Sequence, residues 1–277
     1  MKPDNLKFIE ADKSHIASLK EIWKISFGDE DEYIDFFFEN RFNTCKTIVV
    51  LNNGKPIGAM YLMNVSTIEY GKIKEGFYGY AIALIPDFRG NGIYKIINKE
   101  IQKILFSKNK FYILSPANEK LCEYYKSLGF IENAYVSEEI FIPDTSNRDY
   151  ECTDLTNEDF IRLRNSNFRN LIRWDKAGMD YILNENKFLK GINLLINVNQ
   201  NQYYIIARFV DNVLIVIESN AITKDLKQDI SNFLCKKYSC NKVQWTGPAE
   251  KNRKDKVLYG LSWNLKSDNY YLNHILN

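Results

Sequence analysis

The pattern of hydrophobic and polar residues in the first half of the chain changes repeatedly between the periods of strands and helices. Apolar residues at every second position, or in short unbroken runs, are typical of strands, whereas repeats of three and four residues are typical of helices. The pair Asn53-Gly54 lies between two such strand runs and predicts a β-hairpin. We therefore expect a strand at 6–11, a helix capped by Ser14, a helix at 29–42, a hairpin of strands 47–51 and 56–68, a polar turn at 69–76 and a strand at 80–85.

The second half repeats this order of elements after a polar stretch, 143–149, that is rich in turn residues. Strands near 135–142 are expected to close the first sheet. The chain therefore predicts two α/β domains, at 1–142 and 150–277. The second domain is expected to contain helices at 156–168, 170–184 and 223–238, and strands at 191–198, 202–210, 212–218 and 242–245.

The run Pro86–Tyr94 lies between a strand and an amphipathic helix at 93–106. A turn from a strand into a helix directs several backbone N–H groups to one place, where the helix dipole adds partial positive charge. Gly90 and Gly92 allow a ligand to approach the backbone closely, and Arg89 adds a cation with a forked set of donors. The turn therefore predicts a phosphorylated ligand.

Several interpretations compete for this run, including a plain strand-to-helix turn. A P-loop would need Gly-x-x-x-x-Gly-Lys-Ser/Thr, which the chain lacks. A dinucleotide-binding fold would need a third glycine where Lys95 stands. The sequence Arg89-Gly-Asn-Gly92-Ile-Tyr94 instead resembles the pyrophosphate loop, Arg-x-x-Gly-x-small, of the GNAT family of N-acetyltransferases.

A second segment, 111–130, resembles the other signature of the GNAT family. A short apolar strand at 111–114 is followed by Asn118, which is a good N-cap for a helix. This helix is expected to end before Gly129, within a Tyr-x-x-x-Gly-Phe pattern that begins at Tyr125. The two motifs occur in the family's order, and the resemblance covers about residues 5–142.

The resemblance implies a fold, a cosubstrate and a set of site residues. It implies two tandem GNAT-like domains with mixed, mostly antiparallel sheets flanked by helices, and an acetyl-CoA site in the first. It also implies that Tyr125 is the general acid for the leaving thiolate, and that backbone groups of one strand serve the pantetheine arm and the oxyanion. The residues assigned to acetyl-CoA binding are Ile82, Ala83, Leu84, Arg89, Gly90, Asn91, Gly92, Ile93, Tyr94 and Asn118.

One residue departs from the family pattern, because the loop usually ends in Gly or Ala and this chain has Tyr94. Its ring is expected to point away from the phosphates and to cover the adenine or the mouth of the pantetheine tunnel. No general base is assigned, since His15 and His274 are poorly placed and a water chain is an alternative. The candidate carboxylates are Asp29, Glu30, Asp31, Glu32, Glu69 and Glu75.

In the second domain the corresponding connection, 218–224, contains no glycine and no Arg-x-x-Gly. We therefore expect a degenerate GNAT-like domain without an acetyl-CoA site of its own. The tandem layout resembles the first two domains of the large acetyltransferases of the enhanced-intracellular-survival type, without their sterol-carrier-like third domain. The second domain is expected to wall the acceptor groove or to form an interface, which leaves a homo-oligomer open.

Composition limits the partners. The 37 basic and 35 acidic residues give a net charge of +2, which lacks the basic surplus typical of nucleic-acid-binding proteins and argues against aminoacyl transfer from tRNA. The five cysteines show no metal-ligand spacing, so no metal is expected. No apolar run approaches the roughly 20 residues of a membrane span, and no apolar leader follows the N-terminus. A cytoplasmic protein without a membrane partner is therefore expected.

The sequence thus predicts an acetyl-CoA-dependent N-acetyltransferase that acts on a primary amine of a small molecule or peptide. The alternative from another class is a non-catalytic CoA-binding regulator or interaction protein. Only the enzyme requires the hydroxyl of Tyr125, so this residue separates the two hypotheses.

Overall fold

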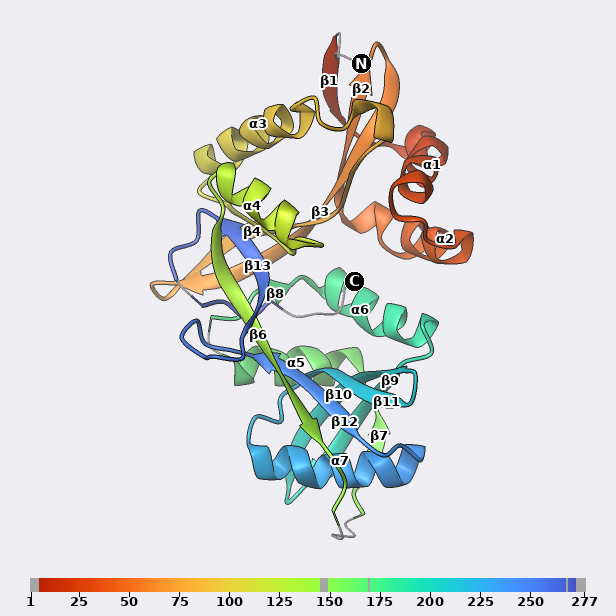
Figure 1. Ribbon diagram of the computed structural model, residues 1–277, viewed down its shortest axis with the longest axis vertical. Coiled ribbons are helices and arrows are strands. Elements are labelled where there is room, and N and C mark those ends of the chain that lie inside the picture. The colour runs from red at the N-terminus through yellow and green to blue at the C-terminus, as the bar shows by residue number, and fades with distance from the viewer. Residues whose placement is uncertain (1–4, 145–148, 169, 268, 273–277) are drawn as a thin grey trace. The chain divides into compact units, whose positions relative to one another are not determined.

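The computed structural model describes residues 5–144, 149–168, 170–267 and 269–272 (Figure 1). The chain divides into two compact units, each of which is discontinuous in sequence. The first unit contains Met1–Glu132 and Gly260–Lys266, and the second contains Asn133–Tyr259 and Ser267–Asn277.

The sheet of the first unit is antiparallel except at one pair of strands. Neighbours along it pair antiparallel, but β4 and β5 run parallel, which requires the crossover helix between them. The edge next to β5 is formed by residues 261–263 of β13. The strands are β1 (Leu6–Glu10), β2 (Lys46–Asn52), β3 (Lys55–Glu69), β4 (Lys72–Leu84), β5 (Phe111–Leu114) and β13 (Val257–Trp263).

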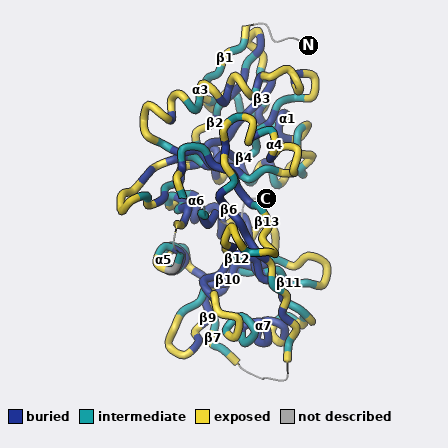
Figure 2. The backbone as a smooth tube through the Cα atoms, turned by 60° about the vertical axis from the view of Figure 1, so that its left-hand side comes forward, coloured by how far each residue is buried: buried dark blue, intermediate teal, exposed yellow. Residues whose placement is uncertain are grey.

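Helices cover both faces of this sheet, as Figure 1 shows. The helices α1 (Ile16–Phe27) and α2 (Asp31–Asn40) lie on one face, where Trp23 packs against rings of the sheet. The helices α3 (Ile93–Ser107) and α4 (Glu119–Ser127) lie on the other. Since both faces are covered, β3 is buried without a break from residue 57 to residue 63 (Figure 2).

The second unit has the same pattern of pairing. Its strands follow the order β7, β9, β10, β11, β12 and β6, and only β11 and β12 are parallel. These are β6 (Ile131–Phe141), β7 (Glu151–Asp154), β9 (Ile192–Val198), β10 (Asn201–Val210), β11 (Val213–Ser219) and β12 (Val243–Pro248), with a two-residue strand, β8 (Arg173–Trp174), elsewhere. Its helices are α5 (Asn157–Asn167), α6 (Lys176–Phe188) and α7 (Lys224–Tyr238).

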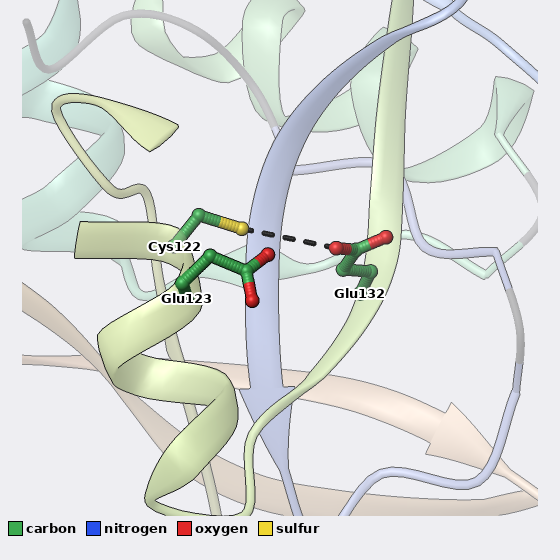
Figure 3. A group of neighbouring side chains, drawn as sticks. All are labelled: Cys122, Glu123 and Glu132. Atoms are coloured by element: carbon green, nitrogen blue, oxygen red, sulfur yellow. Dashed lines mark hydrogen bonds between the residues drawn. The ribbon is translucent and has the colours of Figure 1, made fainter. Parts of the chain in front are cut away.

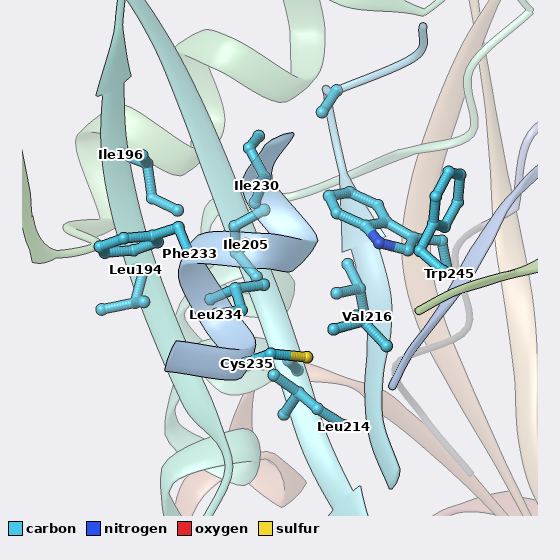
Figure 4. Packing of buried hydrophobic residues seen from close by; sticks show 14 of the residues in the cluster. Leu194, Ile196, Ile205, Leu214, Val216, Ile230, Phe233, Leu234, Cys235 and Trp245 are labelled. Carbon is cyan, nitrogen blue, oxygen red and sulfur yellow. The ribbon is translucent and has the colours of Figure 1, made fainter. Parts of the chain in front are cut away.

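The core of the second unit lies between α7 and the sheet. Apolar residues at helical spacing on α7 meet alternating apolar residues of the strands (Figure 4). Leu234 of α7 and Val216 of β11 are both fully buried there, together with Trp245 of β12. The indole N–H of Trp245 donates to the hydroxyl of Ser231 over 2.8 Å, so its polar atom is also satisfied.

The units exchange their last strands, which the sequence analysis did not predict. The strand expected to close the first sheet, β6, belongs mostly to the second unit, where it pairs with β12. Residues 261–263 of β13, near the C-terminus, take the place next to β5. The division near residue 132 therefore differs from the boundary expected at 142–150. A local pattern cannot reveal this exchange, because both strands have the same alternation in either sheet.

Smaller differences have local causes. The expected polar turn at 69–76 is mostly strand, since β3 and β4 form one long hairpin that reverses at Tyr70-Gly71. The first helical segment is capped by Asp12 rather than Ser14, because the Asp12 carboxylate accepts from the Ser14 amide over 2.9 Å.

In the part of the chain that the structure describes, no helix is long and apolar enough to cross a membrane. Residues 145–148 of the linker and His274 lie outside the described residues.

Replacement of Leu234 by Ala tests the core of the second unit. Leu234 is fully buried, so the cavity should lower the free energy of unfolding by about 2–5 kcal/mol. Leu226, on the same helix but only partly buried, should cost clearly less when replaced by Ala. Amide hydrogen exchange of α7 and β11 measures the local loss. Equal losses in the two variants would show that α7 does not hold this core.

Candidate active site

The strand β4 loses its partner midway, and this opens the sheet. Gly76–Gly79 of β4 pair with Phe111–Leu114 of β5, and β5 ends there. Among the described residues, 80–84 of β4 therefore have no strand partner on that side. In the same stretch β4 has one extra residue relative to β3, and Ala81 adopts a φ of 44°, which defines a β-bulge. Backbone groups at 82–84 can thus pair with an extended ligand.

The turn after β4 has the geometry of an anion site. The chain passes through a short 3-10 turn, Pro86–Phe88, and enters α3 through Gly90 and Gly92, whose φ angles are 75° and 71°. Such angles strain any residue with a Cβ. Gly92 is the N-cap of α3 and offers no side-chain acceptor, so the first-turn amides, which begin at Ile93, are open to an anion. Added Cβ atoms at Gly90 and Gly92 would meet no described atom within 4 Å, which shows that the space above the loop is free.

The side chain of Arg89 is held against the end of β4. Its Nε donates to the carbonyl of Leu84 over 2.7 Å, and its Nη2 lies 3.4 Å from the hydroxyl of Ser26. The residue remains exposed, so its other N–H groups can reach a phosphate. Asn91 donates from its side chain to the carbonyl of Arg89 over 3.0 Å and stabilises the loop from within.

The helix α4 begins as the sequence predicts. The Oδ1 of Asn118 accepts from the amide of Leu121 over 3.0 Å, which confirms its capping role and leaves its contact with acetyl-CoA a prediction. Tyr125 lies on the inner side of this helix and is 8% exposed. Burial raises the pKa of Tyr125 to about 12, so its hydroxyl is protonated at neutral pH and can act as an acid.

Tyr94 projects from α3 into the interior of the unit and not over the loop. Its ring lies 5.6 Å from that of Tyr125, nearly perpendicular to it at 84°, and 6.0 Å from that of Tyr124. Its hydroxyl is buried. Burial raises the pKa of Tyr94, with Tyr112 and Tyr125 as further causes. The ring therefore lies beside Tyr125 and away from the loop, and its place relative to the adenine or the mouth of the pantetheine tunnel stays a prediction.

Tyr112 connects these two tyrosines to the opening in the sheet. The hydroxyls of Tyr94, Tyr112 and Tyr125 lie close enough to shift one another's pKa values. We call these three residues the phenol cluster. A Cβ added to Gly79 would lie 2.3 Å from the hydroxyl oxygen of Tyr112, so the ring fits only because residue 79 is glycine. Gly79 precedes the bulge at Ala81 by two residues. The phenol cluster thus lies next to the unpaired part of β4.

A second pair of hydroxyls, on the other face, was not identified from the sequence. The hydroxyls of Tyr33 in α2 and Tyr80 in β4 are 3.0 Å apart. The ring of Tyr80 packs edge-on to that of Trp23 in α1, at 5.8 Å. Tyr80 comes directly before Ala81, so this pair lies at the bulge, beside the helices over which the amine was expected to enter. The alternation of Tyr78 and Tyr80 in β4 could have placed both on this face.

Two of the candidate bases lie away from the bulge. Glu75 is on β4, about 20 Å of strand before Ala81. Its carboxylate is 2.8 Å from the ammonium of Lys110, and this contact lowers the pKa of Glu75. Glu69, at the end of β3, is 3.0 Å from Lys74. Both carboxylates are held by ammonium partners, so neither is well placed to accept the proton of the amine.

The acidic residues between α1 and α2 are closer to the acceptor side. Asp29 accepts from the indole N–H of Trp23 over 2.7 Å, and Asp31 forms an ion pair with a lysine of α1. Glu30 and Glu32 are exposed. None of these four carboxylates contributes to the pKa of Tyr94 or Tyr125, so the structure does not bring them to the phenol cluster.

One group of side chains has the composition of a metal site. Cys122, Glu123 and Glu132 lie close together (Figure 3). The ammonium of Lys126 is 2.9 Å from Glu123 and 3.0 Å from Glu132, so both carboxylates already have a cationic partner. Burial raises the pKa of Cys122, which favours the thiol over the thiolate that a metal needs. The group is better explained as a salt bridge that joins α4 to β6.

The second unit contains a counterpart of the opening. The strands β11 and β12 pair in parallel only at Leu214–Val216 and Val243–Trp245, and Ile217 is the extra residue that shifts the register of β11 against β10. The carboxylate of Glu218 accepts from Arg164 over 2.7 Å and from the hydroxyl of Tyr204 over 2.9 Å. These three side chains are fully buried, so they fill the interior beside this bulge.

The connection after β11 is closed by its own side chains. The side chain of Asn220 accepts from the amide of Tyr204 over 2.8 Å and donates to the carbonyl of Gln202 over 3.1 Å. The amide of Ala221 donates to the hydroxyl of Ser219 over 3.0 Å. One amide of this connection is therefore satisfied within the protein, whereas the N-cap of α7, Thr223, makes no side-chain capping hydrogen bond.

Comparisons with known proteins agree with this geometry. Residues 7–132 match the family model of the GNAT acetyltransferase domain. A probable N-acyltransferase from Enterococcus faecalis is similar in fold, with a TM-score of 0.75 and 13% identity over 94% of this chain and 72% of its own. Eis1 from Mycobacterium abscessus gives a TM-score of 0.68 and 7% identity over 94% and 73%.

A third similar structure is a tandem GNAT protein from the clavulanic acid biosynthesis pathway, with a TM-score of 0.55 and 8% identity over 95% of this chain and 100% of its own. A search among curated proteins found no match. At these low identities the similar structures establish the fold alone. Residues 7–132 therefore match the GNAT acetyltransferase domain, and the chain as a whole has the tandem GNAT fold.

Proposed function

We propose that the protein is an N-acetyltransferase that moves the acetyl group of acetyl-CoA directly to a primary amine of a small molecule or peptide. The observation that carries this proposal is the opening of β4 at Ala81, with the Arg89–Gly92 turn at one end and the phenol cluster beside it. An extended, phosphorylated thioester fits these features in that order. The acetyl-CoA site lies in the first unit, and the second unit has no comparable loop.

The residues of the first unit divide the work of binding and catalysis. The first-turn amides of α3 and the guanidinium of Arg89 bind the pyrophosphate. Backbone groups at 82–84 pair with the amides of pantetheine, and one N–H of this strand faces the thioester carbonyl, where it stabilises the oxyanion. Tyr125 donates its proton to the sulfur as the carbon–sulfur bond breaks.

The acceptor amine enters beside α1 and α2. The Tyr33–Tyr80 pair offers hydroxyl groups at the bulge, and the acidic residues at 29–32 favour a cation nearby. The amine loses its proton to water, because the candidate carboxylates Glu75 and Glu69 are held in ion pairs with Lys110 and Lys74. We place the protein in the cytoplasm, where acetyl-CoA is made and used.

Replacement of Tyr125 by Phe should lower kcat by about 100-fold or more, with the affinity for acetyl-CoA nearly unchanged. The assay is thiol release from acetyl-CoA with spermidine, kanamycin, tyramine and a short peptide as acceptors. Tyr61→Phe is the matched control, since Tyr61 is also a buried phenol but packs against Trp23 and not in the phenol cluster. Acetyl-CoA binding without turnover of any amine would favour the non-catalytic CoA-binding protein.

Replacement of Arg89 by Ala should weaken acetyl-CoA binding by about tenfold, because a charge-assisted contact with the pyrophosphate is lost. Lys103→Ala removes an exposed cation further along α3 and should have little effect. Calorimetry is done on the whole chain, since each unit contains a segment from both ends of the sequence. Equal affinities in the two variants would place the pyrophosphate elsewhere.

The pH profile of kcat should rise as the amine loses its proton and then remain level. The pKa of Tyr125 is about 12, so this acid stays protonated and no alkaline loss from it is expected below about pH 11. Initial rates between pH 6 and about pH 10 test this expectation. A descending limb near neutral pH that disappears in Tyr125→Phe would show that the pKa of Tyr125 is much lower in the complex.

A further inference from the structure

The side chain of Tyr94 is larger than a turn of this kind requires, and it carries a buried polar atom. Its hydroxyl makes no hydrogen bond of standard geometry with any described residue. A buried hydroxyl without a partner is unfavourable, so phenylalanine would fill the same space at lower cost. A hydroxyl retained in such a place indicates an interaction with a neighbouring group, and its nearest polar neighbours are the hydroxyls of Tyr112 and Tyr125.

The neighbours of this hydroxyl are all phenols. Tyr125 and Tyr124 face Tyr94 from α4, and Tyr112 faces it from β5. Tyr112 is itself influenced by Tyr78 of β4 and donates its own proton toward the sulfur of Met60, over 3.7 Å. No carboxylate or ammonium group among the described residues contributes to the pKa of Tyr94 or Tyr125.

We propose that Tyr94 is a positioning residue that orients the hydroxyl of Tyr125 and donates a hydrogen bond to its oxygen when the proton leaves. The proposal rests on the proposed function, in which Tyr125 is the general acid. The nearly perpendicular packing of the two rings, at 5.6 Å, fixes their relative orientation before substrate binds. Tyr94 touches no reacting atom and acts only through Tyr125.

The step is balanced as follows. The O–H bond of Tyr125 breaks and an S–H bond forms on the departing thiolate, which leaves a tyrosinate. The hydroxyl of Tyr94 donates to this tyrosinate oxygen and stabilises its charge in a site that is largely closed to water. The tyrosinate recovers a proton from solvent, which has received one from the amine. In the resting protein, burial dominates the pKa of Tyr125 and raises it, while the Tyr94 hydroxyl lowers it.

A spectroscopic titration tests the proposal without an acceptor amine. A ring-fluorinated tyrosine, which is more acidic than tyrosine, is placed at position 125, and its fluorine NMR signal is followed with pH in the whole protein. Replacement of Tyr94 by Phe should raise the apparent pKa of this phenol by about one unit, because the donor to the phenolate is lost. Tyr61→Phe should leave it unchanged. An unchanged pKa in Tyr94→Phe would overturn the proposal, and so would an equal shift in both variants.

A double-mutant cycle with acetyl-CoA and the best acceptor of the amine panel separates this proposal from the function on which it rests. Tyr94→Phe should lower kcat roughly three- to tenfold, with unchanged acetyl-CoA affinity and a melting temperature that does not fall. In the Tyr125→Phe background the same replacement should have no further effect. If Tyr125→Phe keeps full activity, the proposed acid is wrong. If Tyr125→Phe loses activity but Tyr94→Phe does not, only the role of Tyr94 is wrong.

Discussion

The backbone of β4 beyond Gly79 sets the constraint on which the site depends. Buried N–H and C=O groups must find partners, and a strand that loses its neighbour inside a sheet leaves a row of them unpaired. The bulge at Ala81 interrupts the regular backbone of this strand. At the end of the strand, Arg89 donates a hydrogen bond to the carbonyl of Leu84. The remaining groups favour an extended ligand with amides of its own. The loop and the phenol cluster matter because they lie at the two ends of this opening.

The two units show two solutions to the same constraint. Both contain a parallel strand pair, an antiparallel neighbour and an extra residue at the equivalent point, Ala81 or Ile217. The second unit fills the space with the ion pair of Arg164 and Glu218 and closes the connection with side-chain hydrogen bonds. A buried ion pair contributes little to stability compared with apolar packing, so its effect here is to occupy the interior beside this bulge with side chains. The fold is thus kept in both units, and the opening is kept in one.

Local features of the chain could be predicted well, and long-range ones could not. The strand at 111–114, the cap at Asn118 and the turn through Gly90 and Gly92 depend on residues a few positions apart, and all three occur as predicted. The exchange of β6 and β13 depends on which of two similar edges each strand joins, and no local pattern encodes that choice. The phenol cluster was missed for a related reason, because Tyr112 lies on β5 and meets Tyr94 only after both motifs have folded.

Tyr94 joins the two motifs that the sequence separates. Its backbone lies in the first turn of α3, where the phosphate is expected to bind, and its ring packs beside that of Tyr125 in α4. A small residue at this position would leave a space between the helices, and the apolar ring fills it without entering the anion site above Gly90 and Gly92. Tyr94 in place of the small residue of the family pattern is therefore compatible with the loop, since its side chain lies away from the loop. What distinguishes this chain is that the same side chain also places a hydroxyl group against the proposed acid.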